Sequence, residues 1–190
     1  MSPPPMPLAN PPGQIKVLGI LHLVFAGLGV VIVLFGLISQ GFSESMLRMQ
    51  ENAGGIQEAQ SRVSRSLTEA THSINWLGYG SSMLLAVLLV LAGLGLLKGR
   101  RTGLAWSNRY AWTSIVLKII HLVLVATLVI PEMNRLLAEF EGQGPEIKLF
   151  ATVMKPTMIA SMVATPVLSC IYPVLVLILL NRESVRKSLI

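Results

Sequence analysis

Apolar residues dominate four long stretches of the chain, and polar residues gather between them. The four stretches cover residues 15–38, 77–97, 110–130 and 158–180. Each has roughly the 20 apolar residues that a helix needs to cross a hydrocarbon layer of about 30 Å. Strands of a membrane barrel would instead alternate polar and apolar positions in segments of about ten residues. The pattern therefore predicts an all-α protein, an integral membrane antiparallel four-helix bundle.

The first segment expected on the outer side, residues 40–75, carries a helical pattern of its own. Apolar and small side chains recur there at three- and four-residue steps, the spacing of one helical face. Gly54 and Gly55 interrupt the pattern. We therefore expect the first helix to project to about residue 53 and a second helix to return from about residue 56. This hairpin is either a solvated extension or a face that binds a partner.

The second outer segment and the fourth stretch are rich in proline. Segment 131–157 contains two helix starts in which a proline precedes a glutamate, at Pro131 and Pro145. The sequence thus predicts helical extensions on the outer side here as well. Within the last expected helix, each further proline removes a backbone hydrogen bond and favours a disturbance or bend. These prolines are Pro156, Pro166 and Pro173.

Net positive charge is concentrated on one side of the expected bundle. The inner segments hold eight basic residues against Glu183 alone, whereas the outer segments hold six basic residues against the other eight of the nine acidic residues. An excess of Lys and Arg marks the cytoplasmic side, so both termini are expected in the cytoplasm. The same distribution argues that the net charge of +6 serves a membrane surface and not a nucleic acid. The basic residues expected at the membrane surface are Lys98, Arg100, Arg101, Arg109, Arg182, Arg186 and Lys187.

Composition leaves room for one membrane domain and little else. Charged residues make up 13% of the chain, about half the share in an ordinary soluble domain. Residues 1–13 contain six prolines and are expected to form a disordered leader. A single four-span domain follows over 14–183, with its inner loop at 98–109. Residues 184–190 form a basic cytoplasmic tail.

Lys118 fits its apolar surroundings least well. It lies near the middle of the third stretch, where a charged residue costs at least about 2.5 kcal/mol, and no acidic residue lies in any of the four stretches. Three accounts are open. The side chain snorkels inward or pairs with backbone carbonyls; it is held neutral by desolvation; or it lines a polar cavity with His121, which lies one turn away on the same face. A carboxylate of a partner subunit is a further alternative.

Hydroxyl-bearing residues on the fourth stretch share one helical face. Together with Lys118 and His121, they form either an intramembrane polar seam or a set of ordinary interhelical hydrogen bonds. These hydroxyls belong to Ser161, Thr165, Ser169 and Tyr172.

No set of residues indicates catalysis, a metal site or a cofactor. His22 fits a packing histidine, and Cys170 is the only cysteine. The chain has no Asp, so a Ser-His-Asp arrangement is excluded. Glycines in the first two stretches instead favour close helix packing. They are Gly19, Gly27, Gly29, Gly36, Gly93 and Gly95.

Three short segments, the inner turn, the C-terminal tail and the Pro-rich leader, resemble segments of other four-span membrane proteins. The inner turn Gly-Leu-Leu-Lys-Gly-Arg-Arg at 95–101, before an aromatic-led helix, and the tail from Tyr172-Pro173 to Arg186 resemble small uncharacterised bacterial four-span membrane proteins. The Pro-rich leader before a Leu- and Gly-rich first helix is similar, more loosely, to the mammalian CD20-like four-span family. The bacterial resemblance implies no known activity. The lack of Asn-x-Ser/Thr sequons in the outer segments favours a bacterial inner (plasma) membrane over a glycosylated eukaryotic surface, and we expect the protein there.

Together these patterns predict a non-catalytic integral membrane protein. We expect a structural or accessory subunit that acts through helix packing and its outer helical hairpins, within a homo-oligomer or larger membrane complex. Its partners are then the lipid bilayer and other protein chains, with no nucleic acid and no cofactor. The alternative is a small transporter or oligomeric channel that uses the polar seam.

Overall fold

The computed structural model describes residues 13–50, 56–140, 145–183 and 185, and all regular structure in these ranges is helical. The elements are α1 (Gly13–Gln50), α2 (Ile56–Leu97), α3 (Arg101–Leu124), the π-helical turn η1 (Val125–Val129), α4 (Ile130–Phe140), α5 (Pro145–Ser169) and α6 (Ile171–Leu180). Four helical stretches in the described ranges are long and apolar enough to cross a membrane: Gly13–Phe42, Thr71–Leu97, Arg101–Arg135 and Lys155–Leu180. The predicted all-α class with four long apolar helices is confirmed.

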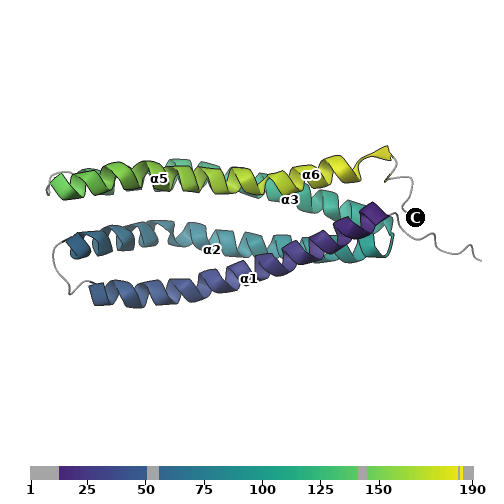
Figure 1. Cartoon of the computed structure of the whole chain (residues 1–190), viewed down its shortest axis with the longest axis horizontal. Coiled ribbons are helices and arrows are strands. Elements are labelled where there is room, and N and C mark those ends of the chain that lie inside the picture. Colours follow the sequence, from purple (N-terminus) through teal and green to yellow (C-terminus); the bar gives the residue numbers. More distant parts are fainter. Residues whose placement is uncertain (1–12, 51–55, 141–144, 184, 186–190) are drawn as a thin grey trace, which may run out of the picture.

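The helices run back and forth along one long axis (Figure 1). Helices α1 and α2 form one antiparallel hairpin. The path α3–η1–α4 and the returning path α5–α6 form a second. The start of α1, the α2–α3 turn and the end of α6 lie together at one end of the molecule, which we call the turn end. The opposite end holds the ends of α1 and α4 and the starts of α2 and α5, and we call it the hairpin end.

The first two helices extend well beyond the apolar stretches that define them. At 1.5 Å per residue, the 42 residues of α2 span about 63 Å, roughly twice the thickness of a hydrocarbon layer. Within the expected outer segment, residues 40–50 and 56–75 are helical, in agreement with the spacing of their apolar residues. The expected glycine turn falls outside the described residues, as do nearly all of the Pro-rich leader and the basic tail.

The turn between α2 and α3 is much shorter than the expected inner loop at 98–109. Only three residues, 98–100, separate the two helices. Gly99 has a φ of 64°, the left-handed conformation that commonly ends a helix and that glycine adopts without strain. A Cβ atom on Gly95 would lie 2.6 Å from the Cα of Gly103, so the two backbones touch just before and after the turn. Because this contact holds the chain in a tight reversal, Arg101–Arg109 can begin α3 at once.

Two prolines, Pro131 and Pro173, disturb the helices, each in the turn that precedes the proline. Helix α5 continues through both Pro156 and Pro166, and the interruption comes at Cys170, between α5 and α6. The π-helical turn η1 lies just before Pro131, which has no N–H to bond the carbonyl four residues earlier. The N–H of Ile130 bonds the carbonyl of Val125 across five residues, which widens the helix where the regular ladder fails.

The described buried residues form three core clusters. One core cluster joins all four helical paths at the turn end, and its members include Ile15, Leu96, Ala111, Val176 and Leu180. Toward the hairpin end, the described residues form two smaller clusters, one around Val125 and Val129 and one around Met133.

Candidate functional site

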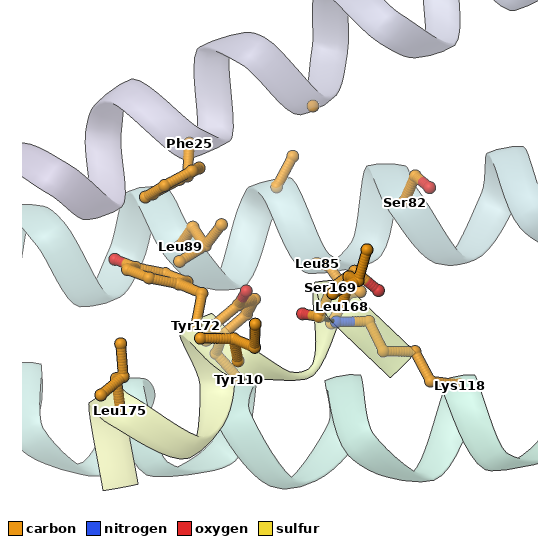
Figure 2. Close-up of a pocket in the computed structure, with 13 residues that line it drawn as sticks. Phe25, Ser82, Leu85, Leu89, Tyr110, Lys118, Leu168, Ser169, Tyr172 and Leu175 are labelled. Atoms are coloured by element: carbon orange, nitrogen blue, oxygen red, sulfur yellow. Dashed lines mark hydrogen bonds between the residues drawn. The ribbon is translucent and has the colours of Figure 1, made fainter. Parts of the chain in front are cut away.

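A cavity of about 500 Å³ lies between these two regions, beside the break between α5 and α6 (Figure 2). It is partly open to its surroundings, and its walls are mostly apolar. All four helical paths contribute to it. The described lining residues are Phe25, Gly29, Ser82, Leu85, Ala86, Leu89, Tyr110, Lys118, Leu168, Ser169, Ile171, Tyr172 and Leu175.

Lys118 lines one end of the cavity and crosses from α3 to the α5–α6 break (Figure 2). Its Nζ donates a hydrogen bond to the backbone carbonyl of Ser169. In a regular helix that carbonyl would accept the N–H of residue 173, but Pro173 has none. The ammonium group therefore donates to a carbonyl that the proline leaves without a backbone donor. Of the accounts open from the sequence, this geometry contains the pairing with a carbonyl. Lys118 also lines a cavity, but the walls are mostly apolar and His121 is not among the described lining residues.

The position of Lys118 is central within its helix. The apolar segment runs from Arg101 to Arg135, so Lys118 is 17 residues from each limit (118 − 101 and 135 − 118). At 1.5 Å per residue, that places it about 25 Å along the axis from either arginine. Arg109, an exposed basic residue of the same helix, is nearer, nine residues (118 − 109) or about 13 Å away. The ammonium group is satisfied at this position by its bond to the Ser169 carbonyl.

A buried cluster of His22, Tyr110 and Tyr172 lies toward the turn end. His22 is fully buried, and its Nδ1 atom lies 2.8 Å from the carbonyl oxygen of Leu18 and 2.8 Å from the Tyr172 hydroxyl. Its ring centroid lies 6.0 Å from that of Tyr110 and 5.7 Å from that of Tyr172. The cluster joins α1, α3 and α6 by polar and ring contacts.

The other ring nitrogen of His22 is left unmatched. Among the described residues, Nε2 is buried and has no hydrogen-bond partner. If Nδ1 carries the proton, Nε2 is an acceptor without a donor; if Tyr172 donates to Nδ1, the Nε2–H has no acceptor. Either tautomer therefore leaves one polar atom unsatisfied in the core of the turn end.

The predicted polar seam is only partly assembled. Lys118, Ser169 and Tyr172 line the same cavity, but His121 is not among its described lining residues. Ser161 and Thr165 are exposed and donate to carbonyls of their own helix, those of Met158 and Ser161. The three- and four-residue spacing defines one face only while the helix is continuous, and the break at Cys170 separates Tyr172 from the two upstream hydroxyls.

The predicted packing glycines divide into two groups. Gly19 and Gly93 mark a close crossing of α1 and α2, since a Cβ on Gly93 would lie 2.9 Å from the carbonyl oxygen of Gly19. Gly36 faces the ring of Tyr79, and Gly95 meets Gly103 across the turn. By contrast, a Cβ on either of the remaining two would have no atom within 4 Å. These two are Gly27 and Gly29, and the second lies on the cavity wall.

The described basic residues expected at the membrane surface are all exposed and all lie at the turn end (Figure 1). They are Lys98, Arg100, Arg101, Arg109 and Arg182; Arg186 and Lys187 lie outside the described residues. The guanidinium carbon of Arg109 lies 4.7 Å from the ring centroid of Trp106, which holds one of these charges over an aromatic face.

Sequence reasoning missed His22 and Tyr110 as members of the site. It took His22 for a packing histidine, and it did not place Tyr110 in the site, although Tyr110 is only 6% exposed and lines the cavity. The Tyr172–His22 contact joins residues 150 positions apart, and no local spacing reports such a pair. A second missed contact is the reciprocal amide pair of Asn108 and Asn181, at 3.2 and 3.3 Å.

No family model, curated protein or solved structure matches this chain. Within the described ranges, no three His, Cys, Asp or Glu side chains come together as a possible metal site. The fold and the cavity therefore define the class on their own. It is a helical protein with four helices apolar enough to cross a membrane, and a mostly apolar cavity that contains one cationic side chain.

Proposed function

We propose that this protein is a non-catalytic integral membrane protein, a structural or accessory component that acts through its helices. The observation that carries the proposal is that polar side chains within the apolar segments form hydrogen bonds to other helices. Tyr172 bonds His22, and Lys118 bonds the Ser169 carbonyl. These contacts join helices to one another, which is the role expected of polar side chains in a membrane bundle.

The exposed apolar surface supports a membrane setting with further chains. Along α1, large side chains such as Ile32 (69%) and Phe35 (72%) are exposed. In a membrane, such side chains meet lipid tails or another helix. Exposed apolar faces on α1 and on α5, where Val167 and Leu168 are exposed, are available to a homo-oligomer or a larger membrane complex. With the basic turn end in the cytoplasm, a bacterial inner membrane is the proposed location.

Topology is tested by cysteine labelling in a Cys170→Ser background. A single cysteine replaces Arg100 in the α2–α3 turn or Glu132 near the start of α4. With a reagent that does not cross membranes, we expect labelling of the Arg100→Cys chain only after the cells are opened. The Glu132→Cys chain should be labelled in intact cells once the outer membrane is permeabilised. The reverse pattern would overturn the proposed orientation.

The accessory role is tested by the oligomeric state. We expect extraction in a mild detergent or in native nanodiscs, followed by native mass spectrometry, to recover a defined homo- or hetero-complex. A monodisperse monomer with no associated chain would contradict the proposal.

A small transporter or channel is the second candidate, because Lys118 lines a cavity that is partly open. The mostly apolar walls disfavour a continuous water path. Under this candidate, Lys118→Leu abolishes solute flux into proteoliposomes, while Lys155→Leu, an exposed lysine on α5 outside the cavity, leaves it unchanged. If Lys118→Leu has no effect on any flux, the cavity does not serve transport.

A further inference from the structure

We propose that the cavity beside Lys118 binds a single-chain amphiphile with a carboxylate head, a long-chain fatty acid. The inference goes beyond the accessory role and does not depend on it. It rests on the placement of the four apolar helices in a membrane, which the cysteine labelling above tests separately.

The charge of Lys118 sets the chemistry of the head group. A lysine ammonium has three N–H donors, and the carbonyl of Ser169 takes one of them. No carboxylate is among the described lining residues, so the positive charge has no countercharge in the cavity. Burying an unpaired charge is costly, and an anion at the two remaining donors would remove that cost through charge-assisted hydrogen bonds.

The walls of the cavity set the chemistry of the rest of the ligand. Leucines from α2 and α5 and the ring of Phe25 provide apolar surface, and Phe25 packs against Tyr172 at a centroid distance of 4.3 Å (Figure 2). The volume of about 500 Å³ lies within the range of small-molecule sites, roughly 300–1,000 Å³. Because the cavity is partly open, an acyl chain longer than the cavity can continue into the surrounding lipid.

The depth of Lys118 distinguishes a fatty acid from a phospholipid. Lys118 is nine residues from Arg109 (118 − 109), the nearest basic residue expected at the membrane surface, or about 13 Å along the helix, which is close to the midplane of a hydrocarbon layer of about 30 Å. A phospholipid headgroup remains at the membrane surface and does not reach the midplane. A carboxylic acid has a small head that a proton can neutralise, which lowers the cost of moving through the hydrocarbon layer.

The binding test uses the full-length chain in phosphatidylcholine nanodiscs, at a pH at which free hexadecanoate is ionised. We expect radiolabelled hexadecanoate to bind saturably, one molecule per chain. Hexadecan-1-ol, which has the same chain without the charge, should bind at least about tenfold more weakly, the effect of losing one charge-assisted hydrogen bond. Acetate, which has the charge without the chain, should show no saturable binding.

Two pairs of variants locate the site. Lys118→Met should weaken hexadecanoate binding by at least about tenfold, whereas Lys155→Met, an exposed lysine outside the cavity, should leave it unchanged. Gly29→Leu places a side chain at the cavity wall and should also block binding. Gly27→Leu is the matched control, because Gly27 is equally open and does not line the cavity. The glycine pair keeps the test decisive if Lys118→Met fails to fold.

Several results would overturn the inference. Equal binding of hexadecanoate and hexadecan-1-ol would show that the charge of Lys118 plays no part. Unchanged binding in both Lys118→Met and Gly29→Leu would place the ligand elsewhere or show partition into lipid only. Displacement of hexadecanoate by phosphatidylglycerol in the nanodisc, at similar concentration, would show that a two-chain lipid occupies the site.

Discussion

The turn end and the hairpin end of the bundle are built from similar apolar helices but are held together differently. At the turn end, three residues connect α2 to α3, glycine backbones touch, and one core cluster includes all four helical paths. Toward the hairpin end, Pro131 follows the π-helical turn η1, and the described buried residues form two small clusters. In a membrane, apolar side chains gain little by leaving lipid for protein. Close backbone contacts and polar pairs are therefore expected to hold the turn end together, and the cavity lies beside them, lined by Tyr110 and Tyr172.

The largest effect is expected where two backbones touch. Gly95→Leu would place a side chain within the Gly103 backbone, and a backbone has no alternative rotamer that could make room. We expect a loss of at least about 3 kcal/mol, enough to prevent recovery of folded protein. Fluorescence-detected size-exclusion chromatography and thermal unfolding in detergent measure it. Gly27→Leu, which meets open space, is the control; equal loss in both variants would contradict a special role for the contact.

Two fully buried residues, one from each end, are expected to differ in what their truncation costs. Leu96 and Met133 are both fully buried; Leu96 belongs to the cluster that joins all four helical paths, and Met133 packs against Met158 and Ile159. We expect Leu96→Ala to lower the free energy of unfolding by about 3 kcal/mol and Met133→Ala by about 2 kcal/mol or less, because the flexible side chain of Met158 can move into the space left by the deletion. Unfolding by denaturing detergent gives both values. The reverse order would contradict the comparison.

A coupling of about 1 kcal/mol is expected between Lys118 and Pro173. Lys118→Met alone leaves the Ser169 carbonyl without a donor. Pro173→Ala restores the helical N–H that would bond the same carbonyl, so in that background Lys118→Met should cost less. A double-mutant cycle in unfolding free energy measures the coupling. Strict additivity of the two changes would show that the lysine does not replace the missing N–H.

The smallest effect is expected for the Tyr172–His22 hydrogen bond. Tyr172→Phe removes the hydroxyl and keeps the ring contacts with His22 and Phe25. Since hydrogen bonds between membrane helices average about 0.6 kcal/mol, a loss of that size is expected in unfolding free energy. Tyr79→Phe, at the Gly36 contact, provides a comparison from the other half of the bundle. A loss above about 2 kcal/mol for Tyr172→Phe would show that the bond organises the turn end far more than a single hydrogen bond does.

Local pattern was sufficient for the elements and insufficient for the site. The apolar stretches and the Pro–Glu starts at Pro131 and Pro145 place α4 and α5 closely, because helix starts depend on neighbouring residues. The inner loop was expected to be longer than it is, since the Gly95–Gly103 contact involves two helices and no single segment reports it. A disturbance or bend was expected from each of Pro156, Pro166 and Pro173. Helix α5 continues through the first two, and the interruption at Cys170 lies in the turn before Pro173, whose missing N–H leaves the Ser169 carbonyl unbonded within the helix.

The sequence by itself determined the presence of four long apolar helices, the basic character of the turn between the second and third, and the presence of an uncompensated charge at Lys118. These properties follow from composition and spacing along the chain. Only the tertiary structure decided what Lys118 contacts, that His22 and Tyr110 join Tyr172, and that Ser161 and Thr165 stay outside the site. The physical reason is that the Lys118 contact depends on a carbonyl made available by a proline in another helix, and the cluster depends on residues 150 positions apart. Such pairs exist only once the helices have packed.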